Sequence, residues 1–279
     1  MSSKSPARAT IGFLSTWSVY EGTTIDDYTH ALLQGIYAAA RESDCNLLIG
    51  CGISLPGSPL ASRTAWSAPG PTMDFIPVGP WNTSGLIIIP DDLSDPQFEY
   101  GQDLIHSGFP VVLTTTEKPG PLVAVDNAGG IRQAFDHLYQ HGHRRIALIA
   151  GKKGRGGDSA ERLAGYRQAL QAAGLAEDGR IAMQRILDSG APFTAVLASN
   201  DLSGLGAMEV LRTAGKRIPE DVAVIGFDDI LEARSQIPPL TAVRHPTFTL
   251  GHQALLSLLR MIRFPSLPEA ETFPMRKTR

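Results

Sequence analysis

Cysteine is scarce in this sequence, and so are long apolar runs and charge of one sign. The two cysteines, Cys45 and Cys51, stand on either side of one predicted strand. Six extended residues span about 20 Å, well beyond the roughly 7 Å that separates the Cα atoms of a disulfide. Two thiols alone also cannot complete a structural zinc site. We therefore expect buried free thiols in a reducing compartment.

No apolar stretch approaches the roughly 18–20 residues needed to cross a bilayer. The first ten residues lack the apolar core of a secretory signal peptide. The formal net charge of −3 argues against electrostatic trapping of nucleic acid by the chain as a whole. The 279 residues are 43% hydrophobic and 19% charged, which is typical of a water-soluble protein with one large domain or two lobes. We expect a cytoplasmic protein that makes no membrane contact.

The motifs that carry catalysis or bind nucleotides are also missing. GxSxG, HExxH and CxxC do not occur in the sequence. GKKGRGG at 151–157 matches neither the dinucleotide nor the P-loop pattern, although its backbone could cradle an anion at a helix N-terminus. His245, just before Pro246, is typical of a turn. We expect no cofactor, no metal site and no catalytic residue; a glycosidase or a nucleotide-dependent transferase is the enzyme alternative.

Short apolar runs alternate with amphipathic stretches along the chain. Continuous apolar runs of four to six residues are typical of parallel strands buried on both faces. Residues 54–80 are rich in Pro, Gly and Ser, and they predict a long loop, which in a compact domain is often functional. The predicted strands are Thr10–Leu14, Asn46–Gly50, Gly85–Ile89, Val111–Thr114, Ile146–Ala150, Ala195–Ala198 and Val222–Gly226.

Helices are predicted between these strands from a 3.6-residue apolar period and from end signals. Asp158 and Glu161 match a capping box, Asn200 or Asp201 is suited to cap the next helix, and a further helix covers about 247–262. The glycines that end the earlier helices are Gly142, Gly174 and Gly215. This alternation of strand and helix predicts an α/β fold with mainly parallel sheets.

Polar residues follow the predicted strands at their carboxyl ends, where open parallel sheets bind ligands. Asn200 and Asp201 follow one strand, Asp228 follows the next, and Trp17 follows the first. Carboxylates and amides exchange hydrogen bonds with paired hydroxyls, and Arg162 would add a rigid fork of donors. These residues predict a site for a neutral polyhydroxylated molecule. The alternative is that most of them are helix caps and loop residues.

Four blocks of the sequence are similar to one known family. They are GHRRIALIAG (142–151), ERLAGYRQAL (161–170), FTAVLASNDLSGLGAMEVLRTAGKRIPEDVAVIGFDDI (193–230) and PPLTAVRHP (238–246). In order and spacing they resemble the effector-binding core of the lactose/galactose-repressor (LacI/GalR) family. The resemblance covers about residues 9–263 and is looser over 51–82.

The resemblance implies a periplasmic-binding-protein-like type I fold. Two α/β lobes, each a parallel sheet flanked by helices, are joined by three crossovers and close on a small molecule. The implied N-terminal lobe is 9–142 plus 246–264, and the implied C-terminal lobe is 143–245 plus 265–279. Lobe closure would supply the two states that signalling requires. The implied effector is a sugar or related polyol ahead of a purine, and the implied assembly is a homodimer.

The resemblance also carries ligand-binding residues over, position by position. Arg162 in ERLAG and Asp228 in GFDD match the family's effector-binding arginine and acid. Asn200 in SND matches a contact position of several members, and Asp158 lies on the effector-contacting turn. The aromatic candidates from the first lobe are Trp17 and Tyr28. The structural alternatives are a turn cap for Asp228 and a packing role in the first helix for Tyr28.

Two departures from the family pattern bear on function. DNA-binding members carry a helix-turn-helix and a hinge helix ahead of this core, whereas here the first predicted strand begins at Thr10. We therefore expect this chain not to bind an operator by itself, and to reach DNA through an N-terminal domain outside it. The chain is also shorter than the family pattern near Gly179–Arg180 and Met275–Arg276. True deletions there would remove an aromatic wall of the pocket, whereas missing residues would leave breaks in the chain.

The sequence thus predicts the small-molecule sensing domain of a LacI-type transcriptional regulator, which would control an output module outside this chain. The same core attached to a signalling enzyme, such as a kinase or cyclase, is the second hypothesis. A solute-binding protein of a sugar transporter is the third. The block ERLAGYRQAL and the lack of a signal peptide favour the first hypothesis.

Overall fold

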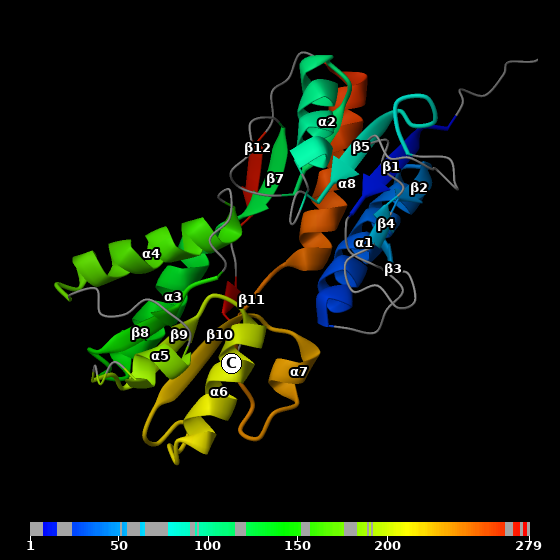
Figure 1. The fold of residues 1–279 in the computed structure, drawn as a ribbon. Helices are drawn as coiled ribbons and strands as arrows, with labels where there is room; N and C mark the ends of the chain where they lie inside the picture. Colours follow the sequence, from blue (N-terminus) through cyan, green and yellow to red (C-terminus); the bar gives the residue numbers. More distant parts are fainter. Residues whose placement is uncertain are drawn as a thin grey trace, which may run out of the picture. The chain divides into compact units, whose positions relative to one another are not determined.

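The structure, a computed structural model, forms two compact units that the chain enters alternately (Figure 1). Unit 1 is Met1–Ala124 with Thr247–Thr272, and unit 2 is Val125–Pro246 with Phe273–Arg279. No helix within the described residues is long and apolar enough to span a membrane. The described residues are 8–15, 24–50, 52–54, 62–64, 78–89, 93, 95–114, 121–151, 157–175, 183–188, 190, 192–265, 270–273 and 276–277.

Unit 1 is built on a six-stranded sheet in the order β12-β7-β6-β5-β1-β2. Neighbouring strands from β7 to β2 run parallel, as expected for continuous apolar runs such as Thr10–Leu14. The strands are β1 (Thr10–Leu14), β2 (Asn46–Gly50), β5 (Gly85–Ile88), β6 (Val111–Leu113), β7 (Leu122–Val125) and β12 (Ala270–Phe273). A separate antiparallel pair joins β3 (Gly52–Ser54) to β4 (Ser62–Thr64).

The helices of unit 1 are α1 (Thr24–Glu42), α2 (Asp95–His106) and α8 (Thr247–Arg263). Helix α8 comes from the far end of the sequence and packs along α1. Their backbones approach closely, because a Cβ at Gly35 would lie 2.0 Å from the carbonyl oxygen of Phe248. A side chain at Gly251 would meet the carbonyl oxygen of Leu32 at the same distance. Two glycines thus allow the late helix to complete unit 1.

Unit 2 is built on a five-stranded sheet in the order β13-β11-β10-β9-β8. The strands β8 to β11 are parallel, and β13 joins β11 antiparallel. The strands are β8 (Ile146–Ile149), β9 (Ala195–Ala198), β10 (Ala223–Asp228), β11 (Thr241–Arg244) and β13 (Arg276–Lys277). The helices are α3 (Asn127–Gln140), α4 (Asp158–Ala172), α5 (Met183–Asp188), α6 (Asp201–Thr213) and α7 (Leu231–Arg234).

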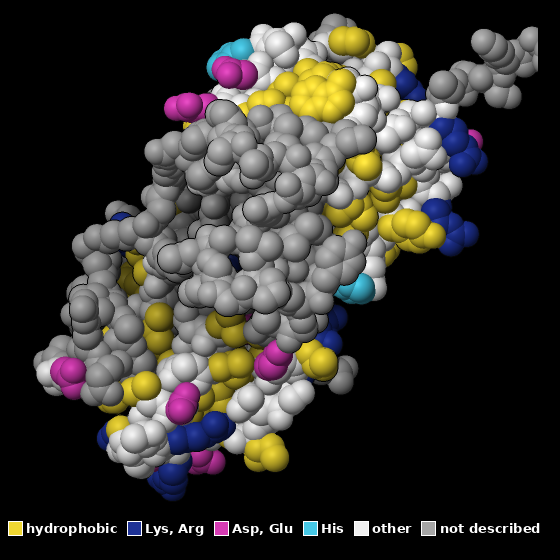
Figure 2. Space-filling model, turned by 45° about the vertical axis from the view of Figure 1, so that its right-hand side comes forward, with side chains coloured by type: hydrophobic (Ala, Val, Ile, Leu, Met, Phe, Trp, Pro, Cys, Tyr) yellow, Lys and Arg dark blue, Asp and Glu magenta, His cyan; other side chains and the backbone are white. Residues whose placement is uncertain are grey.

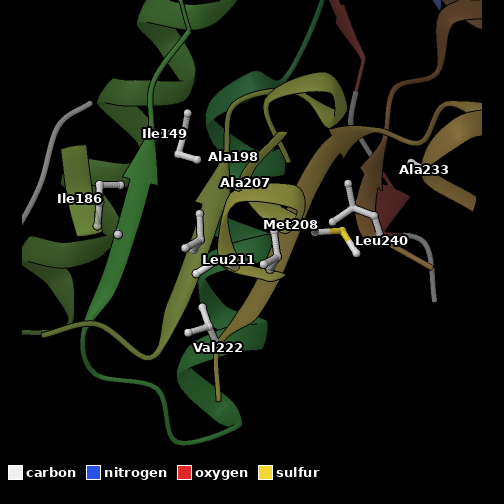
Figure 3. Packing of buried hydrophobic residues seen from close by; sticks show 12 residues of the cluster. Ile149, Ile186, Ala198, Ala207, Met208, Leu211, Val222, Ala233 and Leu240 are labelled. Atoms are coloured by element: carbon white, nitrogen blue, oxygen red, sulfur yellow. The ribbon is translucent and has the colours of Figure 1, made fainter. Parts of the chain in front are cut away.

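Different helices pack on the two faces of the unit 2 sheet. Alternate strand residues such as Ile149, Val196 and Val224 pack against α5 and α6 in one apolar cluster (Figure 3). The other strand residues point to the opposite face, where Phe227 lies beneath a side chain of α4. Helices α3 and α4 pack against each other, and Tyr166 of α4 donates a hydrogen bond of 2.5 Å to the carbonyl of Ile146 in β8.

The predicted α/β fold class and its parallel sheets are confirmed. Most predicted strands recur within one or two residues, and the predicted helix-ending glycines Gly142, Gly174 and Gly215 all have positive φ angles. The predicted strands do not include β3, β4, β7, β11, β12 or β13, all of which have four residues or fewer. Strand β4 forms inside the predicted loop of 54–80, so that prediction was wrong at Ser62–Thr64.

The predictions for the helix N-caps and for the cysteines have mixed outcomes. Asp158 is the first residue of α4 and not its cap, since the N-cap is Gly157 and no side chain caps that end. Asn200 does cap α6, and its side chain accepts a hydrogen bond from the Ser203 N–H at 2.8 Å. Cys45 is a partly buried free thiol. The predictions for Cys51, Trp17 and the steps at Gly179–Arg180 and Met275–Arg276 fall outside the described residues.

The observed units place α3 differently from the implied lobes. The chain leaves unit 1 after Ala124, at the end of the sheet, whereas the implied first lobe extends to residue 142. Helix α3 joins unit 2 because its main partners are α4, β11 and β13. The chain crosses between the units again at Pro246–Thr247 and at Thr272–Phe273. The resemblance implied that these two crossovers lie at 245–246 and 264–265.

Candidate functional site

The candidate site lies in unit 2 and is centred on Arg162 of α4, which is 7% exposed. Its Nε donates a hydrogen bond of 2.8 Å to the side-chain oxygen of Asn127, and its Nη1 donates one of 2.6 Å to the carbonyl of Ser199. The guanidinium carbon lies 3.9 Å from the ring centre of Phe227. Helix α3 and strands β9 and β10 thus hold one planar cation from three directions.

Two carboxyl groups face this cation without closing on it. The Nη2 of Arg162 lies 3.6 Å from Oδ2 of Asp158, one helical turn earlier in α4. Its Nη1 lies 3.5 Å from Oδ1 of Asp228, the last residue of β10. Tight charged hydrogen bonds between such groups measure about 2.7–2.9 Å. About a quarter of each carboxyl side chain is exposed, so part of each carboxyl group is accessible to a ligand.

The backbone at the end of β10 is unusual. Asp228 and Asp229 have φ angles of 120° and 65°, a region that non-glycine residues enter rarely. The carbonyl of Asp228 accepts a hydrogen bond from the His245 N–H, and the carboxylate of Asp229 pairs with Arg234 and Arg244 at 2.9 and 2.6 Å. The Asp229 carboxylate is therefore held by two ion pairs within the fold. The Asp228 carboxyl instead faces Arg162.

Burial dominates the electrostatics of this site. Burial raises the pKa of Asp228 to about 7, with Arg162 opposing the rise and the carboxyls of Asp201 and Asp158 adding to it. Burial also raises the pKa of Asp201 to about 6, against the N–H of Ile230, which lowers it. Burial and then the charge of Arg162 lower the pKa of His245 to about 3. His245 is thus a buried neutral ring, and it lies between β11 and α8, where the sequence suggested a turn.

The predicted site residues fall into three groups. Arg162, Asp228 and Asp158 are brought together. Asn200 starts α6 directly after Ser199, whose carbonyl binds Arg162, but its side-chain oxygen is used by the cap. Tyr28 is a half-buried residue of α1 in unit 1, and Trp17 is outside the described residues.

Sequence reasoning missed the residues that hold Arg162 in place. Asn127 is fully buried and lies 35 positions away in sequence, so no local pattern links it to Arg162. Phe227 lies inside the strand run and reads as a core residue. The one available signal was the polar pair Asp126–Asn127 directly after the apolar run LVAV, which is typical of a strand followed by a helix cap.

The arrangement is suited to binding a neutral polar molecule. The remaining N–H groups of Arg162 are donors, and Asp158 and Asp228 supply acceptors, so a ligand with adjacent hydroxyls can use both. The aromatic face of Phe227 is already covered by the guanidinium. Among the described residues, no three His, Cys, Asp or Glu side chains gather where they could hold a metal ion.

Comparison with known proteins finds one matching domain family and a set of similar bacterial proteins. The family model of the periplasmic binding protein-like domain matches residues 135–278, just over half of the chain. The transcriptional regulator CelR of Thermobifida fusca is 42% identical over 176 residues, which cover 58% of this chain and 51% of CelR. The transcriptional repressor CytR of Escherichia coli K12 is 37% identical over 158 residues, or 50% of this chain and 44% of CytR.

A solved structure of one such regulator matches this chain over nearly its whole length. The complex of the transcriptional regulator CelR with cellobiose has a TM-score of 0.78 and 28% identity, and the match covers 99% of this chain and 85% of that one. The two-sheet architecture described above is thus the architecture of a ligand-bound regulator. The chain spans about half the length of the curated relatives that it matches.

Proposed function

This chain belongs to the periplasmic binding protein-like domain family, as its resemblance to the LacI/GalR core predicted, and we propose that it senses a small molecule for a LacI-type transcriptional regulator. The observation that carries the proposal is the cluster of Arg162, Asp158 and Asp228. A buried cation with two partly exposed carboxyl groups at 3.5–3.6 Å places donors and acceptors side by side. Similarity to the regulators CelR and CytR supports the same role.

The effector that we propose is a sugar or related polyol. Two carboxyl groups beside one guanidinium disfavour an anionic ligand at this cluster, because a ligand phosphate or carboxylate would face like charge. Neighbouring hydroxyls can donate to the carboxyl groups while their oxygens accept from Arg162. Cellobiose is the first probe, since a structurally similar regulator binds it. A purine is the second ligand class.

We assign no catalytic step to this site. The relatives named above are transcriptional regulators, and the proposal requires only binding. A glycosidase would need two carboxyl groups that flank a glycosidic bond, whereas Asp158 and Asp228 lie on either side of a buried arginine. Incubation with cellobiose and detection of glucose tests this point, and no release of glucose is expected.

The output of the sensor is proposed to be transcription. The relatives are regulators of the helix-turn-helix type, so the DNA contact would come from a domain outside this chain, and the protein would act in the cytoplasm. Attachment to a signalling enzyme and a role in sugar transport are the alternatives. A change in operator binding when the full-length protein meets its sugar would distinguish the first role from both.

Thermal unfolding against a panel of sugars, sugar phosphates, purines and nucleosides tests the proposed function. A ligand at about 100 times its dissociation constant stabilises the folded state by roughly 2.7 kcal/mol. That corresponds to a shift of about 5–10 °C for a chain of this size. We expect a shift with a neutral sugar, cellobiose first. A shift with sugar phosphates alone would contradict the assigned ligand class, and a flat panel would contradict sensing.

A further inference from the structure

Asn127 is a buried amide that the proposed ligand does not need to touch. It is the first residue of α3, and the preceding Asp126 fixes this end of the helix by accepting a hydrogen bond from the Gly129 N–H at 2.7 Å. The side-chain oxygen of Asn127 accepts from Nε of Arg162 at 2.8 Å. Its side-chain nitrogen donates to Oε2 of Glu161 at 3.4 Å. The amide therefore spans two successive residues of α4.

Arg162 makes only long ion pairs with its two acidic neighbours. A guanidinium next to a carboxylate in a poorly solvated site favours a paired arrangement with two short hydrogen bonds. Here the short hydrogen bonds run to Asn127 and to the Ser199 carbonyl at 2.8 and 2.6 Å. The carboxyl groups of Asp158 and Asp228 stay at 3.5–3.6 Å. Neutral acceptors thus hold the cation back from its charged neighbours.

We propose that Asn127 is a positioning residue that prevents Arg162 from closing onto Asp158 and Asp228, and so keeps their hydrogen-bonding positions available to the sugar hydroxyls. This inference rests on the proposed function. A hydrogen bond to Nε fixes the plane of the guanidinium, because Nε lies at its inner edge. The carbonyl of Ser199 and the ring of Phe227 then fix its rotation and depth.

Close packing of α3 on α4 makes the amide contact possible. A Cβ at Gly165, three residues after Arg162, would lie 2.8 Å from the Cα of Ala128. Ala128 is the neighbour of Asn127, so the two helices approach each other closely beside the amide. The close spacing of the helices therefore places the Asn127 side chain within hydrogen-bonding distance of Arg162.

The test compares variants of the full chain by two independent measurements. Hydrogen exchange at Arg162 Nε is followed in arginine ¹⁵N–¹H spectra, where the Arg162 signal is the one that R162K removes. Calorimetry measures the affinity for cellobiose. Asn127→Leu and Asn127→Ala remove the acceptor, and Asn127→Asp retains a side-chain oxygen at its place. Gln140→Leu, an amide-to-leucine change at an exposed position of the same helix, is the control.

In the wild type we expect a protected Nε–H signal of Arg162. Asn127→Leu and Asn127→Ala should lose that protection and bind cellobiose about tenfold more weakly, since one hydrogen bond to a charged group is removed. Asn127→Asp should keep the protection, and Gln140→Leu should change neither measurement. If the leucine variant does not fold, the alanine variant decides.

Unchanged protection of Nε–H in folded Asn127 variants would overturn the inference. Unchanged cellobiose affinity after loss of protection would overturn it too, because the amide would then be only structural. A wild type that binds no sugar, with the protection pattern as expected, would instead count against the proposed function. The exchange measurement requires no ligand, so the two failures are distinguishable.

Discussion

At the scale of single residues, the pKa values of Asp201 and Asp228 follow from burial more than from ion pairing. Asp201 has no exposed surface, and one of its oxygens accepts from the Ile230 N–H at 2.8 Å. Its other oxygen makes no hydrogen bond to any residue that the structure describes. An ionised carboxylate with one free buried oxygen is costly, so the folded protein holds a proton there up to about pH 6.

This raised pKa predicts the pH dependence of stability. Between about pH 4 and pH 6 the folded state keeps a proton on Asp201 that the unfolded chain has released, so Asp201 makes unfolding easier as pH rises through that window. Asp201→Asn keeps an acceptor for Ile230 and removes the titration. We expect the variant to gain about 1–3 kcal/mol relative to the wild type between pH 4 and pH 8, measured by urea unfolding at several pH values.

A control separates this effect from a general change of charge. Asp221→Asn also removes one negative charge, but Asp221 is paired with Arg217 at 2.8 Å on the surface, and that pair lowers its pKa. Its stability curve should not show the gain toward high pH. Parallel stability curves for the wild type and Asp201→Asn would show that Asp201 does not retain its proton.

Residue identities were predictable where motif and chemistry coincide, and unpredictable where packing supplies the partner. Arg162, Asp158 and Asp228 stood in recognisable blocks, and the structure brings them together. Asn127 could not be found, because its role exists only after α3 packs on α4. His245 lies between β11 and α8, where the sequence suggested a turn, but only the tertiary fold reveals that it is buried.

At the scale of elements, the approach of α3 and α4 is the feature that builds the site. Glycine in a helix interior normally destabilises by about 1 kcal/mol relative to alanine. Gly165 is an exception because an added Cβ would lie 2.8 Å from the backbone of Ala128. Gly206 in α6 has nothing within 4 Å of an added Cβ, so it provides a matched position without that constraint.

We therefore expect opposite signs for the same substitution. Gly165→Ala should lower the free energy of unfolding, by about 1–3 kcal/mol as for other overpacked positions, and should weaken sugar binding through Arg162. Gly206→Ala should raise it by about 1 kcal/mol. Thermal and urea unfolding of both variants test this. A stabilised Gly165→Ala would mean that the two helices have room between them.

Element boundaries were predictable when hydrophobicity alone decides them. β1 and β2 were predicted to the residue, because a short run of apolar residues between polar segments favours a strand. The start of α4 was misassigned, since Asp158 and Glu161 match a capping box, whereas the structure begins that helix after Gly157 at a φ of 97°. A glycine conformation of this kind leaves no periodic signal.

At the scale of the whole molecule, we propose self-association. Large apolar side chains reach the surface (Figure 2). In unit 2 the most exposed are Leu231 and Ile237, at 65% and 90% exposure. Leu202 lies near Leu231, because the Asp201–Ile230 hydrogen bond joins the residues just before them. Large apolar side chains that are exposed in this way are typical of interaction surfaces.

We expect a homodimer in solution, by light scattering after gel filtration. A variant with both Leu231→Lys and Ile237→Lys should dissociate at concentrations where the wild type is dimeric, because burying two charges at an interface is costly. Thr213→Lys adds the same charge at an exposed position of α6 and should stay dimeric. A wild type that is monomeric at high concentration would refute self-association and would favour the transport alternative.

The most direct test of the account is the affinity of the wild type and of Asp228→Asn for cellobiose, measured by titration calorimetry at pH 8, where the Asp228 carboxyl is mostly ionised. Asparagine suits the positive φ of this position, so the fold should persist. We predict that Asp228→Asn binds at least about tenfold more weakly, while Asp221→Asn binds like the wild type. Equal affinity of Asp228→Asn and the wild type would contradict the claim that this cluster holds the effector.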